Sequence, residues 1–211
     1  MSTILKIWPY DWVPEGPRGF VRELRLRWAA EEAGLPYEIC TVPFEDRATN
    51  HLAHQPFGQV PFLTDGYVTL FESGACLLHM ANQSEALMPR DKAGKASTLQ
   101  LVLAALNSIE IVTVPWWFLE VSGQKENPLT GWMDMRLAQI EVVLSENEWL
   151  AADRFTAADL LMADVLRVAK IRAHGHRPAS EAFVERLTAR PAFKKAYADQ
   201  IAHFAAADGL R

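Results

Sequence analysis

The segment Phe57–Ser73 (FGQVPFLTDGYVTLFES) combines residue types that could hold both the main chain and the charged end of a small peptide. The Val60–Pro61 bond stands at the entry to a predicted strand, a position where a cis peptide can occur. A cis bond there would turn the N–H and C=O of Val60 outward, exposing an edge that can pair with a peptide backbone. Glu72 and Ser73 then open a predicted helix, whose free N–H groups and positive dipole end suit a carboxylate.

Together these features predict a receptor for a small acidic peptide. The same pattern also fits a hairpin followed by a capped helix that binds nothing, because Asp65-Gly66 is a strong two-residue turn signal and Ser73 is a common cap. The residues alone leave both interpretations open.

Few other residues have a spacing typical of catalytic or metal sites. His174-Gly-His176 falls in a predicted turn without a nearby cysteine or acidic cluster, so we expect no metal site. Cys40 and Cys76 fall in a strand pattern and a helix pattern, and we expect both to be buried and unreactive. The first helix carries no C-x-x-C motif, which argues against a thioredoxin-type redox enzyme.

The elements that would position the segment alternate between strand and helix over residues 1–84. We expect strands at Thr3–Trp8, Tyr37–Val42, Val60–Thr64 and Tyr67–Leu70, helices at Phe20–Ala33 and Glu72–Asn82, and an ambiguous polar stretch, compatible with an irregular helix, at Phe44–His54. In the first helix the apolar face carries Val21, Leu24 and Trp28, and another face carries Arg18, Arg22 and Arg25. Gly34 is placed to end this helix.

From Met88 onward the pattern is helical throughout. We expect helices at Lys92–Val121, Leu129–Leu150, Thr156–Ala173, Glu181–Thr188 and Ala192–Ala206. Thr156 with Asp159 three residues later forms a capping-box pattern, which we assign to stability. The sequence therefore predicts an α/β unit over residues 1–84 and an all-α unit over residues 90–211.

Composition limits the partners of this chain of 211 residues. The net charge is −5 and no basic block is present, which argues against nucleic acid as a partner. No apolar run approaches the roughly 20 residues needed to span a membrane, and the N-terminus does not have the pattern of a signal peptide. With only two cysteines, we expect a reduced, cytoplasmic protein.

Several runs, in this order and spacing, resemble the glutathione site of cytosolic glutathione transferases. They are Gly58-Gln59-Val60-Pro61, Asp65-Gly66 and Leu70-Phe71-Glu72-Ser73, preceded by Gly34-Leu35-Pro36-Tyr37-Glu38, which is similar to the family's link from first helix to second strand. With the helical half, the resemblance covers nearly the whole chain. It implies a thioredoxin-like βαβαββα domain that binds glutathione as co-substrate, followed by an all-α domain with a site for a small apolar electrophile.

The resemblance also implies roles for single residues. Pro61 would be the cis-proline, and the backbone of Val60 would pair with the cysteinyl part of glutathione. Glu72 would approach the ammonium group of the γ-glutamyl end and Ser73 its carboxylate, while Gln59 would lie nearby as a polar contact. In the helical half, Thr156 and Asp159 look like the N-cap of the family's central buried helix. The aromatic cluster Trp116-Trp117-Phe118 has a spacing typical of core residues, but in this family the acceptor pocket is lined from the same region, so part of the cluster could face it.

The group that would activate the glutathione thiol is harder to assign. In most of the family a Tyr, Ser or Cys near the end of the first strand hydrogen-bonds the sulfur and lowers its pKa. Between Ile4 and Ile39 this chain has no Ser, Thr or Cys, a departure from that pattern. Tyr10 is the candidate by elimination. Arg18 is its rival through positive charge, and main-chain N–H groups are a third source.

The resemblance implies two further expectations. Phe57 stands where some classes of the family carry an aromatic that inserts into a partner subunit, so we expect a homodimer with Phe57 as a contact. The leading function is conjugation of glutathione to apolar electrophiles, although the same site can serve isomerisation, dehalogenation or peroxide reduction. The alternative is a non-catalytic binding or interaction module. The Glu72-Ser73 pair argues against that alternative, and the missing Ser or Cys argues for it.

Overall fold

The computed structural model describes residues 4–45, 51–123 and 125–209. By its internal contacts the chain divides into two units, one made of Met1–Leu87 with Arg190–Arg211 and the other of Met88–Ala189. The main difference from the expected division is that residues 190–211 belong with the first unit and not with the helical unit, and the boundary falls at residues 87–88.

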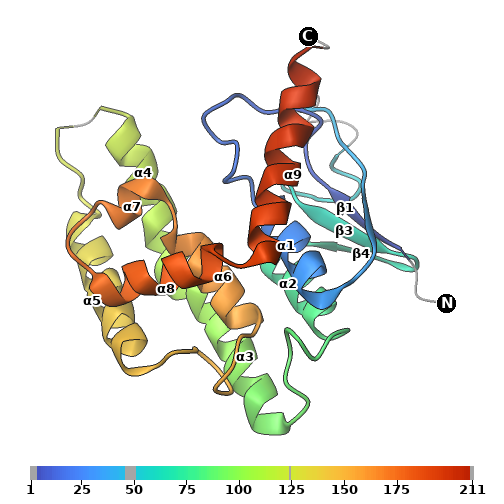
Figure 1. The fold of residues 1–211 in the computed structure, drawn as a ribbon. Coiled ribbons are helices and arrows are strands. Elements are labelled where there is room, and N and C mark those ends of the chain that lie inside the picture. Colours follow the sequence, from blue (N-terminus) through green and yellow to red (C-terminus); the bar gives the residue numbers. More distant parts are fainter. Residues whose placement is uncertain (1–3, 46–50, 124, 210–211) are drawn as a thin grey trace. The chain divides into compact units, whose positions relative to one another are not determined.

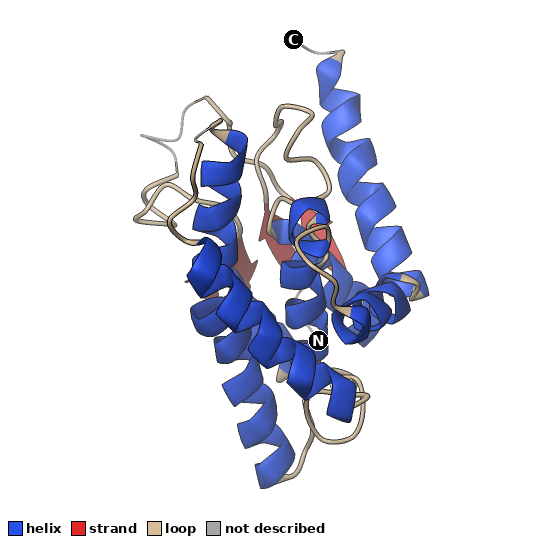
Figure 2. Cartoon of the chain, turned by 90° about the vertical axis from the view of Figure 1, so that its left-hand side faces the viewer, coloured by secondary structure: helices blue, strands red, loops and turns tan. Residues whose placement is uncertain are grey.

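The first unit is built on one four-stranded sheet, drawn in red in Figure 2. Its strands are β1 (Leu5–Trp8), β2 (Tyr37–Ile39), β3 (Phe62–Asp65) and β4 (Val68–Phe71), in the order β2-β1-β3-β4. β1 runs parallel to β2 and antiparallel to β3, and β3 and β4 form the hairpin predicted from Asp65-Gly66. Residues 51–54 form turns and no helix, while residues 46–50 lie outside the described part of the chain.

In its described residues the first unit also has three helices: α1 (Glu23–Ala33), α2 (Ser73–Ala81) and α9 (Pro191–Asp208). α1 packs against both other helices, and Figure 1 shows α9 running beside it. The Trp28 ring of α1 meets the Phe193 ring of α9 edge-on, with centroids 4.8 Å apart. Gly34 ends α1 as expected, with a φ of 63° that favours glycine.

Burial of α1 is more complete than its sequence pattern predicts. All residues from Glu23 to Ala30 are buried, because α2 and α9 cover two of its sides. Arg25 is 2% exposed, so the face of the helix that carries it is also covered. Arg27 and Glu23 are also buried and pair with each other along α1, and Glu23 accepts a hydrogen bond from Gln200 of α9.

In its described residues the second unit is helical. Its elements are α3 (Lys92–Ala104), a π-helical turn η1 (Ala105–Glu110), α4 (Ile111–Val121), α5 (Thr130–Glu146), α6 (Ala157–Leu166), α7 (Ala169–Arg172) and α8 (Pro178–Thr188). Every residue of α6 is buried, and Thr156 caps it as predicted. Asp159 accepts hydrogen bonds from the N–H groups of Thr156 and Leu150, each at 2.8 Å. The expected fold class, a thioredoxin-like domain followed by an all-helical domain, is confirmed.

One helical stretch corrects an expectation about membranes. Residues 92–121, which run through α3, η1 and α4, include an 18-residue window with a mean hydropathy of 1.5. By length and composition alone this stretch could cross a membrane, although buried helices of soluble proteins pass the same test and 33% of the window is buried here. Several of its apolar side chains are at least 45% exposed: Leu99, Leu103, Ile111, Phe118 and Val121.

Candidate functional site

The entry to β3 has the geometry predicted for it. The Val60–Pro61 peptide bond is cis, as expected. The two residues before Val60 are held by their carbonyl oxygens: that of Gly58 accepts from the Tyr10 hydroxyl at 3.2 Å, and that of Gln59 accepts from His51 Nε2 at 2.5 Å. Within the described residues no hydrogen bond occupies the main-chain N–H or C=O of Val60, and the side chain of Gln59 is exposed.

The turn from β4 into α2 brings Glu72 and Ser73 together. Glu72 is exposed and takes a φ of 68°, a conformation that is uncommon outside glycine and is often found at ligand sites. Ser73 is buried and is the first helical residue of α2, so it is not the cap that its type predicts. Glu72 occupies the cap position, and its side chain makes no capping hydrogen bond. The first turn of α2 therefore keeps its amide donors available.

A buried arginine beside Ser73 escaped the sequence analysis. The Arg25 guanidinium, on α1, donates to Ser73 Oγ at 3.0 Å. Because the serine oxygen accepts this bond, its own proton remains free to donate to another group. A helix N-terminus, a hydroxyl donor and a buried cation thus meet at one point, which is the chemistry of a carboxylate site. The only sequence signal was Arg25 itself, whose spacing places it on a face apart from the apolar residues of the helix.

The two candidate activating residues lie in the loop between β1 and α1 (residues 9–22). Tyr10 is 9% exposed, packs edge-on against Phe44 and His51, and donates its hydroxyl proton to Gly58. Arg18 donates through Nη1 and Nη2 to the two carboxylate oxygens of Asp208, at 2.7 and 2.5 Å, and also to the Val13 carbonyl. Both polar groups are therefore engaged within the first unit.

The carboxylate that holds Arg18 comes from the last residue of α9. Hydrogen bonds from Arg18 and from the Trp12 indole lower the pKa of Asp208 to about 2. The same ion pair raises the pKa of Arg18. The two groups thus stay charged at neutral pH, and the guanidinium is held at the end of α9.

Phe57 lies at the surface of the first unit. Its side chain is 66% exposed and meets Phe71, itself 37% exposed, with ring centroids 6.1 Å apart. Tyr67 and Val68, in the neighbouring hairpin, are also exposed. The two phenyl rings form an exposed aromatic pair of the kind that anchors interfaces.

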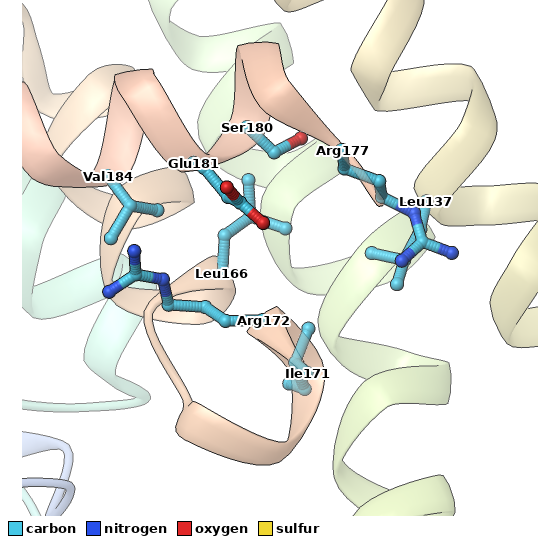
Figure 3. Close-up of a pocket in the computed structure, with 8 residues that line it drawn as sticks. All are labelled: Leu137, Leu166, Ile171, Arg172, Arg177, Ser180, Glu181 and Val184. Atoms are coloured by element: carbon cyan, nitrogen blue, oxygen red, sulfur yellow. The ribbon is translucent and has the colours of Figure 1, made fainter. Parts of the chain in front are cut away.

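The second unit has a small pocket of its own, shown in Figure 3. It is lined by Leu137, Leu166, Ile171, Arg172, Arg177, Ser180, Glu181 and Val184. Its empty volume is about 280 Å³ even when open solvent at the mouth is included, below the usual size of a ligand cleft. No residue of the predicted site lines it, so we do not assign the electrophile to this pocket.

Cysteine and metal chemistry find little support in the described residues. Cys76 is buried, and burial raises the pKa of its thiol to about 12. Cys40 is only partly buried, which corrects the expectation that both cysteines are buried. Among the described residues no group of three or more His, Cys, Asp or Glu side chains could hold a metal ion, and His174 is paired with Asp134 at 2.7 Å.

Comparisons with known proteins agree with this architecture. Residues 16–82 match the family model described as glutathione S-transferase, N-terminal domain, and residues 131–191 match glutathione S-transferase, C-terminal domain. Glutathione S-transferase F11 of Arabidopsis thaliana is 32% identical over 145 residues, covering 61% of this chain and 68% of that relative. The solved structure of glutathione S-transferase III in apo form superposes with a TM-score of 0.73 at 27% identity, covering 92% of this chain and 96% of the other.

A third similar protein shares the fold at lower identity. A glutathione transferase family member from Pseudomonas fluorescens, solved with two glutathione bound, has a TM-score of 0.79 at 22% identity, with 92% of both chains covered. The fold and the matched domains define a thioredoxin-like domain joined to a helical domain. The chain belongs to the glutathione S-transferase family, and this membership supports glutathione transferase activity in general.

Proposed function

We propose that this protein binds glutathione in its first unit and activates the thiol for attack on small apolar electrophiles. In this proposal the free main-chain groups of Val60, which follow the cis bond to Pro61, pair with the cysteinyl part of glutathione. Ser73 binds the γ-glutamyl carboxylate, Glu72 binds the γ-glutamyl ammonium group, and Gln59 is a polar contact at the rim.

The observation that carries the proposal is the arrangement around Ser73. Its hydroxyl is buried, accepts from the buried Arg25, and stands at the first turn of α2 with a proton to donate. A carboxylate placed there would gain a charge-assisted hydrogen bond, the field of the guanidinium and the helix dipole. Glu72, one residue earlier and exposed, offers the complementary negative charge for the adjacent ammonium group.

For activation of the thiol we favour main-chain N–H groups of the β1–α1 loop over the two side chains predicted from the sequence. The single proton of Tyr10 is used on Gly58, and the guanidinium of Arg18 is used on Asp208 and Val13. Tyr10 would have to give up its present bond to donate to sulfur, and Arg18 would have to leave its carboxylate. Each remains a candidate catalytic group that substitution can test.

A second proposal concerns assembly and rests on the exposed aromatic pair of Phe57 and Phe71. We propose that the protein is a homodimer in which this pair contacts the partner copy. The apolar side chains exposed along residues 92–121 are a second surface that a partner could cover.

A non-catalytic binding module is the competing function. It is favoured because both candidate activating side chains, Tyr10 and Arg18, already hydrogen-bond other groups of the protein.

Calorimetric titration with glutathione and with cysteinylglycine, which lacks the γ-glutamyl group, tests the binding proposal. The site predicts that glutathione binds and that the shorter peptide binds at least about tenfold more weakly, because a hydrogen bond to a charged group contributes roughly 1.5–3 kcal/mol. Equal affinity for the two peptides, or no binding of glutathione, would overturn it.

A further inference from the structure

We propose that the C-terminal helix α9 acts as a splint for the β1–α1 loop (residues 9–22), holding it in one conformation against the thiol of bound glutathione. Gln200, His203 and Asp208 are its positioning residues. The splint itself follows from contacts within the first unit, and its effect on glutathione rests on the proposed function.

The loop-facing residues of α9 recur at helical spacing. They are Tyr197, Gln200, His203, Phe204 and Asp208. Except for the neighbours His203 and Phe204, successive members of this set are separated by three or four residues. Such spacing places side chains along one stripe of a helix. One continuous face of α9, about three turns long, therefore contacts the loop from its beginning to its end.

Two hydrogen bonds fix the main chain at both ends of the loop. Gln200 Nε2 donates to the Val21 carbonyl at 3.0 Å and to Glu23 Oε1 at 2.7 Å. His203 Nε2 lies 3.1 Å from the Tyr10 carbonyl, which can only accept, so this nitrogen carries the proton. Burial, with the charge of Arg27 adding to it, lowers the pKa of His203, which keeps the ring neutral at physiological pH.

Apolar packing fills the space between these bonds. Phe204 is fully buried in a cluster with Tyr10 and Val13, and Val60 packs on the same cluster. The Tyr197 ring lies so close to Gly19 that a Cβ added there would come within 2.7 Å of it. Gly19 has a φ of 83°, so both its conformation and the nearby ring require glycine.

The last residue of α9 completes the splint. A carboxylate at a helix C-terminus is disfavoured by the helix dipole, so Asp208 gains nothing from its own helix. Its stabilisation comes from the loop, through the Trp12 indole at 2.7 Å and the forked Arg18 guanidinium. Arg18 also donates twice to the Val13 carbonyl and so links two positions within the loop.

The held loop adjoins the edge proposed to bind glutathione. Tyr10 reaches Gly58 through its hydroxyl, and Val13 shares the cluster against which Val60 packs. A cysteinyl group paired with Val60 would therefore place its sulfur beside this loop. If main-chain N–H groups stabilise the thiolate, they do so only while the loop is held, because preorganised donors need no reorganisation when charge develops.

Substitution of Asp208 tests the splint, because the splint and a direct charge effect of Arg18 predict opposite changes in the thiol pKa of bound glutathione. Asp208→Asn and Asp208→Ala would be compared with Asp199→Asn, which changes a partly exposed acid of α9 that pairs with Lys195 on the same helix. Two quantities would be measured: amide hydrogen exchange of residues 10–22, and the thiol pKa of bound glutathione by ultraviolet titration. Asp208 is half exposed at a helix end, so both variants should fold, and melting curves would verify this.

The splint predicts that loop exchange in the Asp208 variants quickens by about threefold or more, as expected when a cooperative contact is lost. The bound thiol pKa should rise towards the free value. If Arg18 instead acted directly through charge, Asp208→Asn would unmask it and lower that pKa. Unchanged exchange of the loop would overturn the splint, and a lowered or unchanged thiol pKa would overturn its effect on glutathione. An equal effect in Asp199→Asn would overturn both. Failure of the wild type to bind glutathione would overturn the proposed function, leaving exchange alone to decide on the splint.

Discussion

At the scale of single residues, we expect glutathione binding to depend most on one hydroxyl group, that of Ser73. Ser73→Ala removes the donor proposed for the γ-glutamyl carboxylate but leaves Arg25 and the first turn of α2 in place. We expect glutathione affinity to fall by about tenfold to a hundredfold, since hydrogen bonds to charged groups contribute roughly 1.5–3 kcal/mol. Calorimetry measures this. Ser145→Ala, on the exposed part of α5, is the matched control, and a Ser73→Ala affinity equal to that of the control would refute the assignment.

A second residue-scale prediction concerns pH. The pKa of His203 is lowered in the folded state, so the unfolded chain binds its proton more readily than the folded chain. The contribution of His203 to stability is therefore present above the unfolded value of about 6.5 and is lost as the pH falls through the folded value. His203→Gln should flatten the decline in unfolding free energy below about pH 6.5, as measured by denaturant titration at several pH values. An identical decline in both proteins would show that His203 is not the group responsible.

At the scale of elements, the cap of α6 should act on stability alone. Thr156 and Asp159 bond each other at the start of this fully buried helix. Thr156→Ala should lower the free energy of unfolding by about 1 kcal/mol, the usual cost of a lost N-cap. The affinity of the folded protein for glutathione should not change. A large loss of affinity with unchanged stability would contradict this separation of roles.

The sequence predicts those elements that local patterns determine. The β3–β4 hairpin at Asp65-Gly66, the end of α1 at Gly34 and the cap at Thr156 all follow from turn and cap chemistry, and all are present. The break between α6 and α7 and the π-helical turn η1 were not predicted. Both interrupt stretches whose apolar pattern continues across them, so local periodicity gives no signal.

The part of the site that escaped prediction depends on tertiary contacts. Arg25 has the spacing of a surface residue on α1, and only the packing of α2 and α9 around that helix buries it beside Ser73. The partner of Arg18, Asp208, lies 190 residues further along the chain. Because no local pattern links residues so distant, the splint formed by α9 could not be found from the sequence.

At the scale of the whole molecule, assembly should depend on Phe57. Truncation of an aromatic interface anchor often costs 2 kcal/mol or more, so Phe57→Ala should shift the protein towards monomer by about thirtyfold or more in dissociation constant. Sedimentation at several concentrations measures this shift. Tyr67→Ala, which removes a ring that is 99% exposed at the hairpin turn, controls for loss of a surface aromatic. If Phe57→Ala stays as dimeric as the wild type, the anchor assignment is wrong.

The central claim is that this protein binds glutathione and stabilises its thiolate. Ultraviolet titration of the thiol in the complex tests it most directly, because the thiolate absorbs and the thiol does not. A free cysteine thiol has a pKa of about 8.5, and an activating site lowers that pKa. We predict that the pKa of the bound thiol lies at least about one unit below that of free glutathione, so that a substantial fraction of the bound glutathione is thiolate at neutral pH. A bound thiol that titrates like free glutathione would contradict the claim and identify the protein as a binder without catalytic activation.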